Sequence, residues 1–185
     1  MNIDRIAKNL SNGSTEGLKL RSLDKVGTRL RGIVDLPPDG RQFKFEILGF
    51  RGRIFLLIAS GRKRAQQLAR FLSRLIEGEL LEVKVPSRRL RELYQEGVVK
   101  LVVFDMVRIP GLRRVVLTGD AVSDTNMYKE FADVCETRYV LFETREGVLL
   151  GVSDSCSVVA LSSLTDDELF ELVKDRILPL LATPL

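Results

Sequence analysis

The chain has 185 residues, of which 45% are apolar and 29% charged, and it carries a formal net charge of +4. This length and apolar content are enough to bury a hydrophobic core without help from a metal, in one domain or in two small lobes sharing one core. No stretch comes near the roughly 18 consecutive apolar residues of a membrane-spanning helix, and the opening residues lack the apolar segment of a signal peptide. We therefore expect a cytoplasmic protein that does not enter a membrane.

The chain contains no histidine and two cysteines, which excludes much of the common catalytic and metal chemistry. Ser-His-Asp and Cys-His catalytic groups, zinc-protease helices and zinc deaminases all require histidine. A four-cysteine zinc site requires more thiols, and no glycine-rich phosphate loop of the GxxxxGK[ST] or GxGxxG type occurs. We expect no catalytic residue, no cofactor and no metal, and hence no enzyme.

Cys135 and Cys156 bracket a predicted hairpin, so a disulfide between them and a pair of reduced core thiols are both open interpretations. The residue usage is rich in Arg, Glu and Val and has no Trp or His. Such usage is typical of hyperthermophile proteins. From it we expect an archaeal-like, hyperthermophile protein.

Charge is distributed unevenly along the sequence. Residues 1–40 carry a net charge of +2, residues 41–115 carry +10 and residues 116–185 carry −8. A block with so much excess positive charge creates a strong local field. The sequence therefore predicts an anionic partner near its middle.

Apolar and polar periodicity predicts the elements of the first part of the chain. A short helix over residues 3–10 is followed by a connector over 17–27, and from Thr28 three strands are expected, in LRGIV, QFKFEIL and RIFLLIA. The turn clusters DLPPDG and GFRG separate these strands. The run GRKRAQQLARFLSRL then predicts a helix that Ser60 caps and Gly78 ends.

Short strands and helices alternate through the middle of the chain. We expect, in order, a strand over 79–85, a helix after Pro86, strands over 98–108 and 113–119 joined through Pro110-Gly111, and a helix near 125–135.

The first pattern then recurs. TRYVLFETR, VLLGVS and VVALSSL predict three strands, and TDDELFELVKDRILPLL predicts an amphipathic helix. Both sets open with Thr-Arg, at Thr28-Arg29 and at Thr137-Arg138. Ancient duplication and chance recurrence of a common motif are both open explanations.

These elements predict an α+β fold, built mainly from antiparallel sheets of strand-strand-strand-helix units. We divide the chain into an N-terminal helix and connector (1–27), a basic lobe (28–120) and an acidic lobe (121–185). We expect the lobes to share the fold within one compact domain.

The two helices that end the recurring units differ at their first turns. In the later helix Thr165 is the expected N-cap, Glu168 closes a capping box, and Asp166 and Asp167 lie at the positive end of the helix dipole. In the earlier helix the same positions hold Gly61, Arg62, Lys63 and Arg64. Cations at a helix N-terminus cost stability but improve an anion site, which favours phosphate binding.

The rest of the earlier helix continues this positive surface. Lys63, Gln67, Arg70 and Arg74 fall in one stripe at helical spacing, and no carboxylate occurs before Glu77. A purely solvated face usually mixes signs, because like charges at i and i+4 repel each other. We interpret the stripe as a phosphate track, with a merely solvated basic face as the alternative.

Nearby strands supply residues that extend this track. Arg29, Arg31 and Lys44 are expected on the outer faces of their strands, and Arg51 and Arg53 flank the turn that carries Phe50. Exposed aromatic rings stack on bases in single-strand binders, and Phe50 is the candidate for that role. Phe43 and Phe45 share a strand face with Ile47 and are expected in the core.

A second cluster of like charges is expected at the Pro110-Gly111 turn. Arg108 would face Arg113 there, with Arg114 beside them, and either an anion or a neighbouring carboxylate would relieve the repulsion. Asp105, close by, is expected to pair with an arginine.

Glu82-Val83-Lys84 resembles the Glu-x-Lys part of a metal-dependent nuclease motif. Such a site needs another carboxylate from a neighbouring strand, and Glu79 and Glu46 are the candidates. An alternating edge strand produces the same triplet by chance. A nuclease is therefore the third and least favoured hypothesis.

The leading hypothesis is a non-catalytic nucleic-acid-binding protein, with single-stranded DNA or RNA favoured over duplex. The alternative is an assembly subunit whose basic middle docks on the acidic C-terminal third of another copy. We expect a homo-oligomer, most simply a dimer. An exposed apolar patch on the last helix would support it, formed by Leu169, Phe170, Val173, Ile177 and Leu181.

Overall fold

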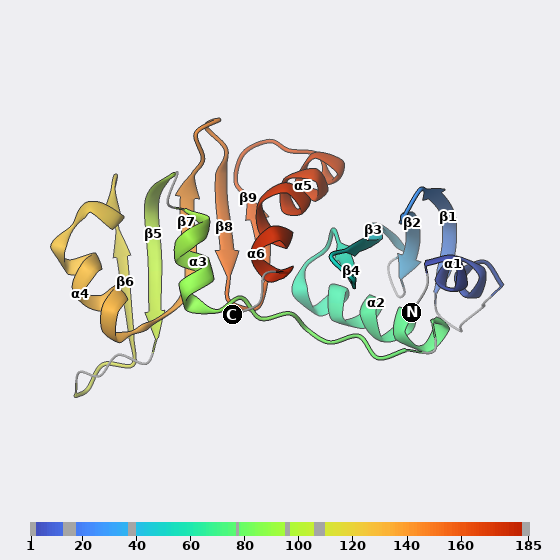
Figure 1. Cartoon of the computed structure of the whole chain (residues 1–185), viewed down its shortest axis with the longest axis horizontal. Coiled ribbons are helices and arrows are strands. Elements are labelled where there is room, and N and C mark those ends of the chain that lie inside the picture. Colours follow the sequence, from blue (N-terminus) through green and yellow to red (C-terminus); the bar gives the residue numbers. More distant parts are fainter. Residues whose placement is uncertain are drawn as a thin grey trace. The chain divides into compact units, whose positions relative to one another are not determined.

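The computed structural model describes residues 3–12, 18–36, 40–76, 78–94, 97–105 and 110–182. Tertiary contacts divide the chain into two compact units, Met1–Leu81 and Glu82–Leu185. The first holds a four-stranded and the second a five-stranded antiparallel sheet, both visible in Figure 1. The predicted α+β class with antiparallel sheets is confirmed.

The first unit folds as a helix, a four-stranded meander and a second helix. Strands β1 to β4 pair in sequence order. The elements are α1 (Ile3–Asn12), β1 (Lys19–Val26), β2 (Arg29–Leu36), β3 (Arg41–Phe50), β4 (Arg53–Ile58) and α2 (Arg62–Leu75).

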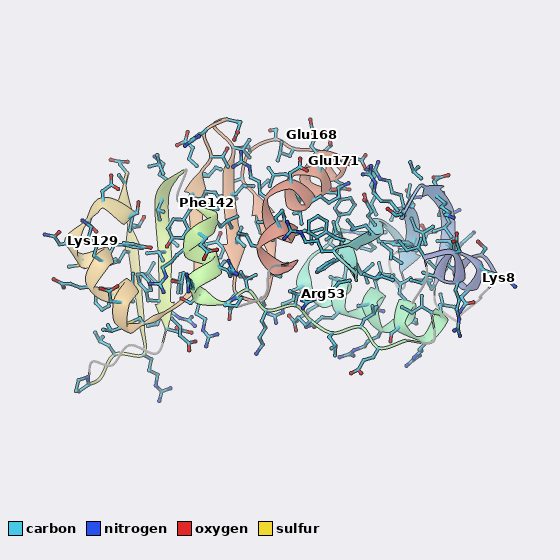
Figure 2. The ribbon with its side chains drawn as sticks, in the orientation of Figure 1. Lys8, Arg53, Lys129, Phe142, Glu168 and Glu171 are labelled. Carbon is cyan, nitrogen blue, oxygen red and sulfur yellow. The ribbon has the colours of Figure 1, made fainter. Side chains whose placement is uncertain are left out.

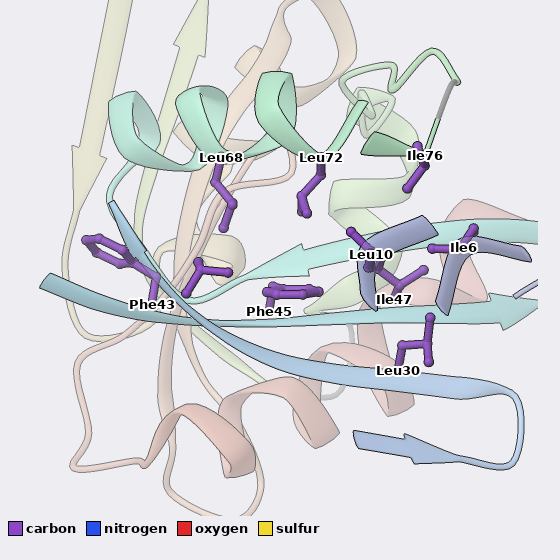
Figure 3. Packing of buried hydrophobic residues seen from close by; sticks show 10 residues of the cluster. Ile6, Leu10, Leu30, Phe43, Phe45, Ile47, Leu68, Leu72 and Ile76 are labelled. Carbon is purple, nitrogen blue, oxygen red and sulfur yellow. The ribbon is translucent and has the colours of Figure 1, made fainter. Parts of the chain in front are cut away.

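The core of the first unit lies between its sheet and both helices. Figure 3 shows this core from close by, with Ile6, Leu10, Leu30, Phe43, Phe45, Ile47, Leu68, Leu72 and Ile76. Leu72 of α2 is fully buried, and Phe43 and Phe45 are buried as expected. The apolar face of α2 therefore holds the helix on the sheet and directs its opposite face toward solvent.

The second unit has the same order of elements with one addition. Its main elements are α3 (Ser87–Leu93), β5 (Val98–Asp105), β7 (Glu136–Glu143), β8 (Leu149–Ser153), β9 (Val158–Ala160), α5 (Asp166–Leu172), the π-helical η2 (Val173–Ile177) and α6 (Leu178–Ala182). Between β5 and β7 the chain adds β6 (Arg114–Thr118), the 3-10 turn η1 (Val122–Asp124) and α4 (Asn126–Val134). Strand β6 pairs with the outer side of β5, so the order is β6-β5-β7-β8-β9. Without this addition, each unit consists of a helix, then a four-stranded meander, then a further helical segment.

Helices cover one face of the second sheet, and aromatic rings fill the space beneath them (Figure 1). Phe104 of β5 contacts the ring of Tyr128 in α4, with 5.8 Å between centroids, and Phe142 of β7 lies 6.3 Å from Tyr94. The hydroxyls of Tyr94 and Tyr128 share a buried hydrogen bond. Tyr94, which directly follows α3, and α4 are thereby held on the strands by both packing and a polar contact.

Several boundaries differ from the expected ones. The unit boundary at Leu81/Glu82 replaces the expected divisions at residues 27 and 120, because residues 19–26 form β1 and because β5 and β6 pair within the second sheet. The alternation of β1 is obscured by an irregularity between Leu20 and Ser22 and by charges along this edge strand.

Three further expectations are wrong. Residues 79–85 form no strand, although the Val85 N–H donates to the Asp154 carbonyl. Gly61 rather than Ser60 is the N-cap of α2, and no side chain caps that helix. The expected apolar patch on the last helix is largely internal, because Phe170, Val173 and Ile177 are buried. Within the described ranges, every helix is too short or too polar to span a bilayer.

Candidate nucleic-acid interface

The two units differ in net charge, and the positive charge is concentrated in the first. Residues 1–81 hold 16 Lys/Arg and 8 Asp/Glu, a net charge of +8, whereas residues 82–185 hold 13 and 17, a net charge of −4. Helix α2 contributes five of these cations and no carboxylate. The basic surface expected from the sequence therefore belongs to the first unit and is densest on α2.

The N-terminus of α2 lacks the usual neutralising features. Gly61 has extended backbone and provides no side-chain cap, and the first turn contains no acidic residue. Arg62 and Lys63 are exposed within it. The partial positive charge of the helix end is thus reinforced by formal charge, which is the electrostatic condition for anion binding.

The stripe along α2 faces solvent. Lys63, Arg70 and Arg74 are all exposed, and no ion pair joins them to a carboxylate among the described residues. Leu68 and Leu72 anchor the opposite face of the helix. At ~1.5 Å rise per residue the three charges extend over ~16 Å, the scale of several phosphates of one strand.

Arg64 also packs against the core. Its guanidinium carbon lies 5.5 Å from the centroid of the Phe43 ring on β3, and the side chain is half-buried. This cation–π contact holds Arg64 at the edge of the sheet. Arg64 therefore connects the first turn of α2, where the stripe begins, to strand β3.

Arg29 and Arg31 lie on the other face of the sheet and have a different role. They alternate along β2 with Leu30, which packs in the core beneath α2. The Arg31 Nε donates to Glu46 Oε2 at 3.0 Å, and Arg29 Nη1 lies 3.9 Å from Oε1. Glu46 is fully buried, and a buried carboxylate requires such partners.

The expected continuous track is therefore divided by the sheet. Lys44 alternates with Phe43 and Phe45, so it also lies on the face opposite α2. Sequence reasoning treated Glu46 only as a metal candidate and missed it as the partner of two arginines. The sequence did contain a sign of this pairing. Glu46 is the one acidic residue of the alternating run QFKFEIL, and it lies on the same face of the sheet as the cations of the neighbouring strand.

Phe50 lies at the tight turn between β3 and β4. Arg51 and Gly52 have φ of 46° and 77°, which defines a two-residue hairpin turn between the paired residues Phe50 and Arg53. The guanidinium carbon of Arg51 is 5.5 Å from the centroid of the Phe50 ring, which is half-buried. Arg53, labelled in Figure 2, is exposed beside them. The alternation that places Lys44 opposite α2 places Phe50 and its pair partner Arg53 on that same opposite face.

In the second predicted cluster of like charge, Arg114 is paired with a carboxylate. Arg114 donates to both carboxylate oxygens of Asp105, at 2.6 and 2.9 Å, and Arg138 approaches the same group at 3.3 Å. The hydrogen bond from Arg114 lowers the pKa of Asp105. The expectation that Asp105 pairs with an arginine is confirmed, and Arg108 lies outside the described residues.

The remaining candidates for chemistry lie in different local environments. Glu82 and Lys84 are exposed in irregular backbone, while Glu46 is held by arginines. No group of three or more Asp, Glu or Cys side chains in the described ranges could hold a metal ion. Cys135 and Cys156 are free thiols, and burial raises the pKa of Cys156 to about 11. A thiol with that pKa is a poor nucleophile at neutral pH.

Comparisons with protein-family models, with curated proteins and with solved structures found no match. The function therefore has to be inferred from the site itself. Its strongest feature is the α2 stripe, which offers exposed cations on a rigid element beside a positive helix end. Such a surface binds polyanions through their phosphates.

Proposed function

We propose that the protein is a non-catalytic nucleic-acid-binding protein that holds single-stranded DNA or RNA through phosphate contacts to α2. The observation that carries this proposal is the exposed stripe of Lys63, Arg70 and Arg74, which forms no ion pair with any carboxylate that the structure describes, on a helix whose N-cap, Gly61, provides no side-chain cap. Arg62 and Arg64 complete the positive first turn. An uncompensated stripe of this kind costs stability, so a ligand that neutralises it accounts for its presence.

A flexible single strand suits this surface because its phosphates can follow one helix face. The β3–β4 turn, which contains Arg51, does not continue this track, because Phe50 and Arg53 lie on the face of the sheet opposite α2. Base stacking by Phe50 stays a separate prediction. Arg29, Arg31 and Lys44 lie on the opposite face of the sheet and take no part in the proposed track.

The test is fluorescence anisotropy with labelled single-stranded DNA, single-stranded RNA and duplex DNA at ~50 and ~200 mM salt, where phosphate contacts produce a steep loss of affinity. We expect K63E/R70E/R74E to abolish most binding. The slope of log affinity against log salt should fall by about 2, from three contacts at about 0.7 each on a single strand.

A matched control carries the same change in charge elsewhere. Lys8, Lys19 and Lys129 are exposed and lie outside α2, with Lys8 and Lys129 labelled in Figure 2. K8E/K19E/K129E should reduce affinity far less than the α2 triple variant. Equal losses for the two variants would mean that net charge rather than the stripe drives binding, and absence of binding by the wild type would end the proposal.

A second candidate function is an assembly subunit in which α2 of one copy docks on an acidic surface of another. The start of α5 favours it, because Asp166, Asp167 and Glu168 lie in its first turn, and Figure 2 places Glu168 and Glu171 on this helix. Charge-driven assembly weakens as salt screens it. Oligomers that form at low salt without nucleic acid, and that K63E/R70E/R74E dissolves, would support this candidate.

A further inference from the structure

The outer face of the second sheet, which lies opposite the helices, is mainly apolar. Phe104 and Phe142 point toward the helical side, where they contact Tyr128 and Tyr94. Side chains alternate along a strand and cross-strand partners share a face, so the strand neighbours of these two residues face outward. The apolar outward residues are Val98, Leu101 and Val103 of β5, Val116 of β6, Tyr139 and Leu141 of β7, Leu149 of β8 and Val159 of β9. A solvated sheet face usually carries polar side chains, so this pattern indicates a face that is covered in the assembled protein.

This outer face exposes apolar surface on several of its strands. Val98, Val116 and Val159 are between 43% and 52% exposed. Leu161 continues the β9 register, because its N–H donates to the Leu149 carbonyl, and it is 60% exposed. The other apolar residues of the face are half-buried. Contiguous apolar surface of this extent marks a site of interaction with another molecule.

Charged residues at the two ends of this face are paired within the chain. At one end Asp105 accepts from Arg114 and lies 3.3 Å from the Arg138 Nε. At the other end Lys100 Nζ lies 3.4 Å from Glu143 Oε2. The face therefore combines an apolar centre with polar ends, as protein–protein interfaces do. An identical face would meet this apolar centre without burying an unpaired charge from these residues.

We propose that this outer face is a homodimer interface, at which the same face of a second copy packs sheet against sheet. The dimensions of the face select this occupant. At ~4.8 Å between strands the five strands span ~24 Å, and at ~3.4 Å per residue β5 and β7 each extend over ~27 Å. A helix is only ~10 Å wide and one strand is narrower, so a single segment would leave at least about half of the face uncovered. A second five-stranded face matches both dimensions.

The area and the flatness of the face also suit a dimer. The strand lengths and spacing give roughly 500 Å² in projection, and the protruding side chains increase the accessible area beyond this value. Specific interfaces take about 600–1,000 Å² from each partner, so we expect a reversible dimer. The ring of Tyr139 occupies the space above Gly151, where a side chain would otherwise project. The centre of the face can therefore approach a second sheet at the usual ~10 Å separation.

Sedimentation of the full chain without nucleic acid, from ~5 to ~500 μM in ~0.5 M salt, tests the proposal where surface charge is screened. We expect a concentration-dependent dimer, because salt does not weaken the burial of apolar surface. V116K/V159K introduces charges at two exposed positions of the face, so it should stay folded and weaken dimerisation at least about tenfold. K63E/R70E/R74E should dimerise like the wild type, which separates this interface from binding through α2.

V26K/V134K supplies the matched control. Val26 of β1 and Val134 of α4 are as exposed as the two interface residues or more so, and neither lies on the proposed interface. The control adds the same two charges and should dimerise like the wild type. A wild type that is monomeric throughout, a V116K/V159K dimer of unchanged affinity, or an equal loss in V26K/V134K would each overturn the proposal.

Tryptophan fluorescence gives an independent measurement that does not depend on disrupting the face. The chain contains no tryptophan, so V159W carries a single reporter on the proposed interface and V134W carries one on α4. As the protein concentration rises, burial by a second copy should shift the V159W emission to shorter wavelengths and reduce its quenching by acrylamide. V134W should change little. A dimer that leaves the V159W reporter as accessible as in the monomer would contradict the proposed interface.

Discussion

Helices α2 and α5 occupy equivalent positions, since each follows the last strand of a four-stranded meander. Both have buried apolar residues, including Leu72 in α2 and Phe170 in α5. Their first turns are opposite in character. Helix α5 has a complete capping box and three acids, whereas α2 has no side-chain cap and three cations. In both helices the apolar face fixes the position of the helix on its sheet. The first turn can therefore vary, and it favours stability in α5 and anion binding in α2.

The largest expected effect concerns the buried apolar face, which both helices have. Leu72→Ala removes a fully buried side chain beneath α2 and should lower the free energy of unfolding by about 2–5 kcal/mol. Urea denaturation measures it, with the exposed Gln66→Ala on the same helix as the control. A loss below about 1 kcal/mol for Leu72→Ala would show that α2 is not held by this face.

Removing the cap of α5 should have the next largest effect. The Thr165 side chain accepts from the Glu168 N–H at 3.3 Å, and the Glu168 carboxylate accepts from the Thr165 N–H at 2.8 Å. Thr165→Ala should destabilise the protein by about 1 kcal/mol, as measured by thermal or urea unfolding. Gly61→Ala at the corresponding position of α2 should cost much less, because no side chain caps that helix. Similar losses at both positions would contradict the comparison.

Reversing a charge in α2 should increase the stability of the protein and weaken its binding to nucleic acid. Lys63→Glu places a carboxylate at the positive helix end and should raise the free energy of unfolding by about 0.5–1 kcal/mol. The same variant should bind single-stranded nucleic acid more weakly than the wild type. Lys129→Glu, in the middle of α4, provides the control. A destabilised Lys63→Glu variant would mean that Lys63 contributes to the fold.

The smallest effect is the dependence of α5 on pH. Hydrogen bonds from the Thr165 backbone and side chain lower the pKa of Glu168 below its ordinary value of 4.5. Because the folded-state pKa is depressed, the stabilisation is present above about pH 4.5 and is lost as the pH falls through the folded value. Unfolding of the wild type and Glu168→Gln between pH 6 and pH 3 measures it. The difference in stability between them should shrink as the pH falls.

Local signals predicted most elements and the contrast between the helix starts. The alternation in QFKFEIL correctly predicted strand β3, and the spacing of Thr165 and Glu168 correctly predicted the capping box of α5. The misses have local physical causes. Charges and an irregularity concealed β1, and the apolar alternation of residues 79–85 did not lead to strand pairing. Propensity is a weak guide where an edge or a connecting segment is concerned.

The candidate site was predictable only in part. The sequence indicated that Lys63, Arg70 and Arg74 share a helix face, because helical periodicity depends on nearby residues alone. Alternation also placed Arg29 and Arg31 on the outer face of their strand, but the sequence could not show that they pair with Glu46. That pairing depends on the register between β2 and β3, which brings residues 15 positions apart into contact.

The sequence by itself determined the α+β composition, the uneven charge and the two contrasting helix starts, since each follows from composition or from spacing within a few residues. Tertiary structure alone decided the unit boundary at Leu81, the buried Glu46 and the apolar outer face of the second sheet. These features depend on which strands pair and in which register. The physical reason is that strand partners are chosen by packing and hydrogen bonding across the whole fold.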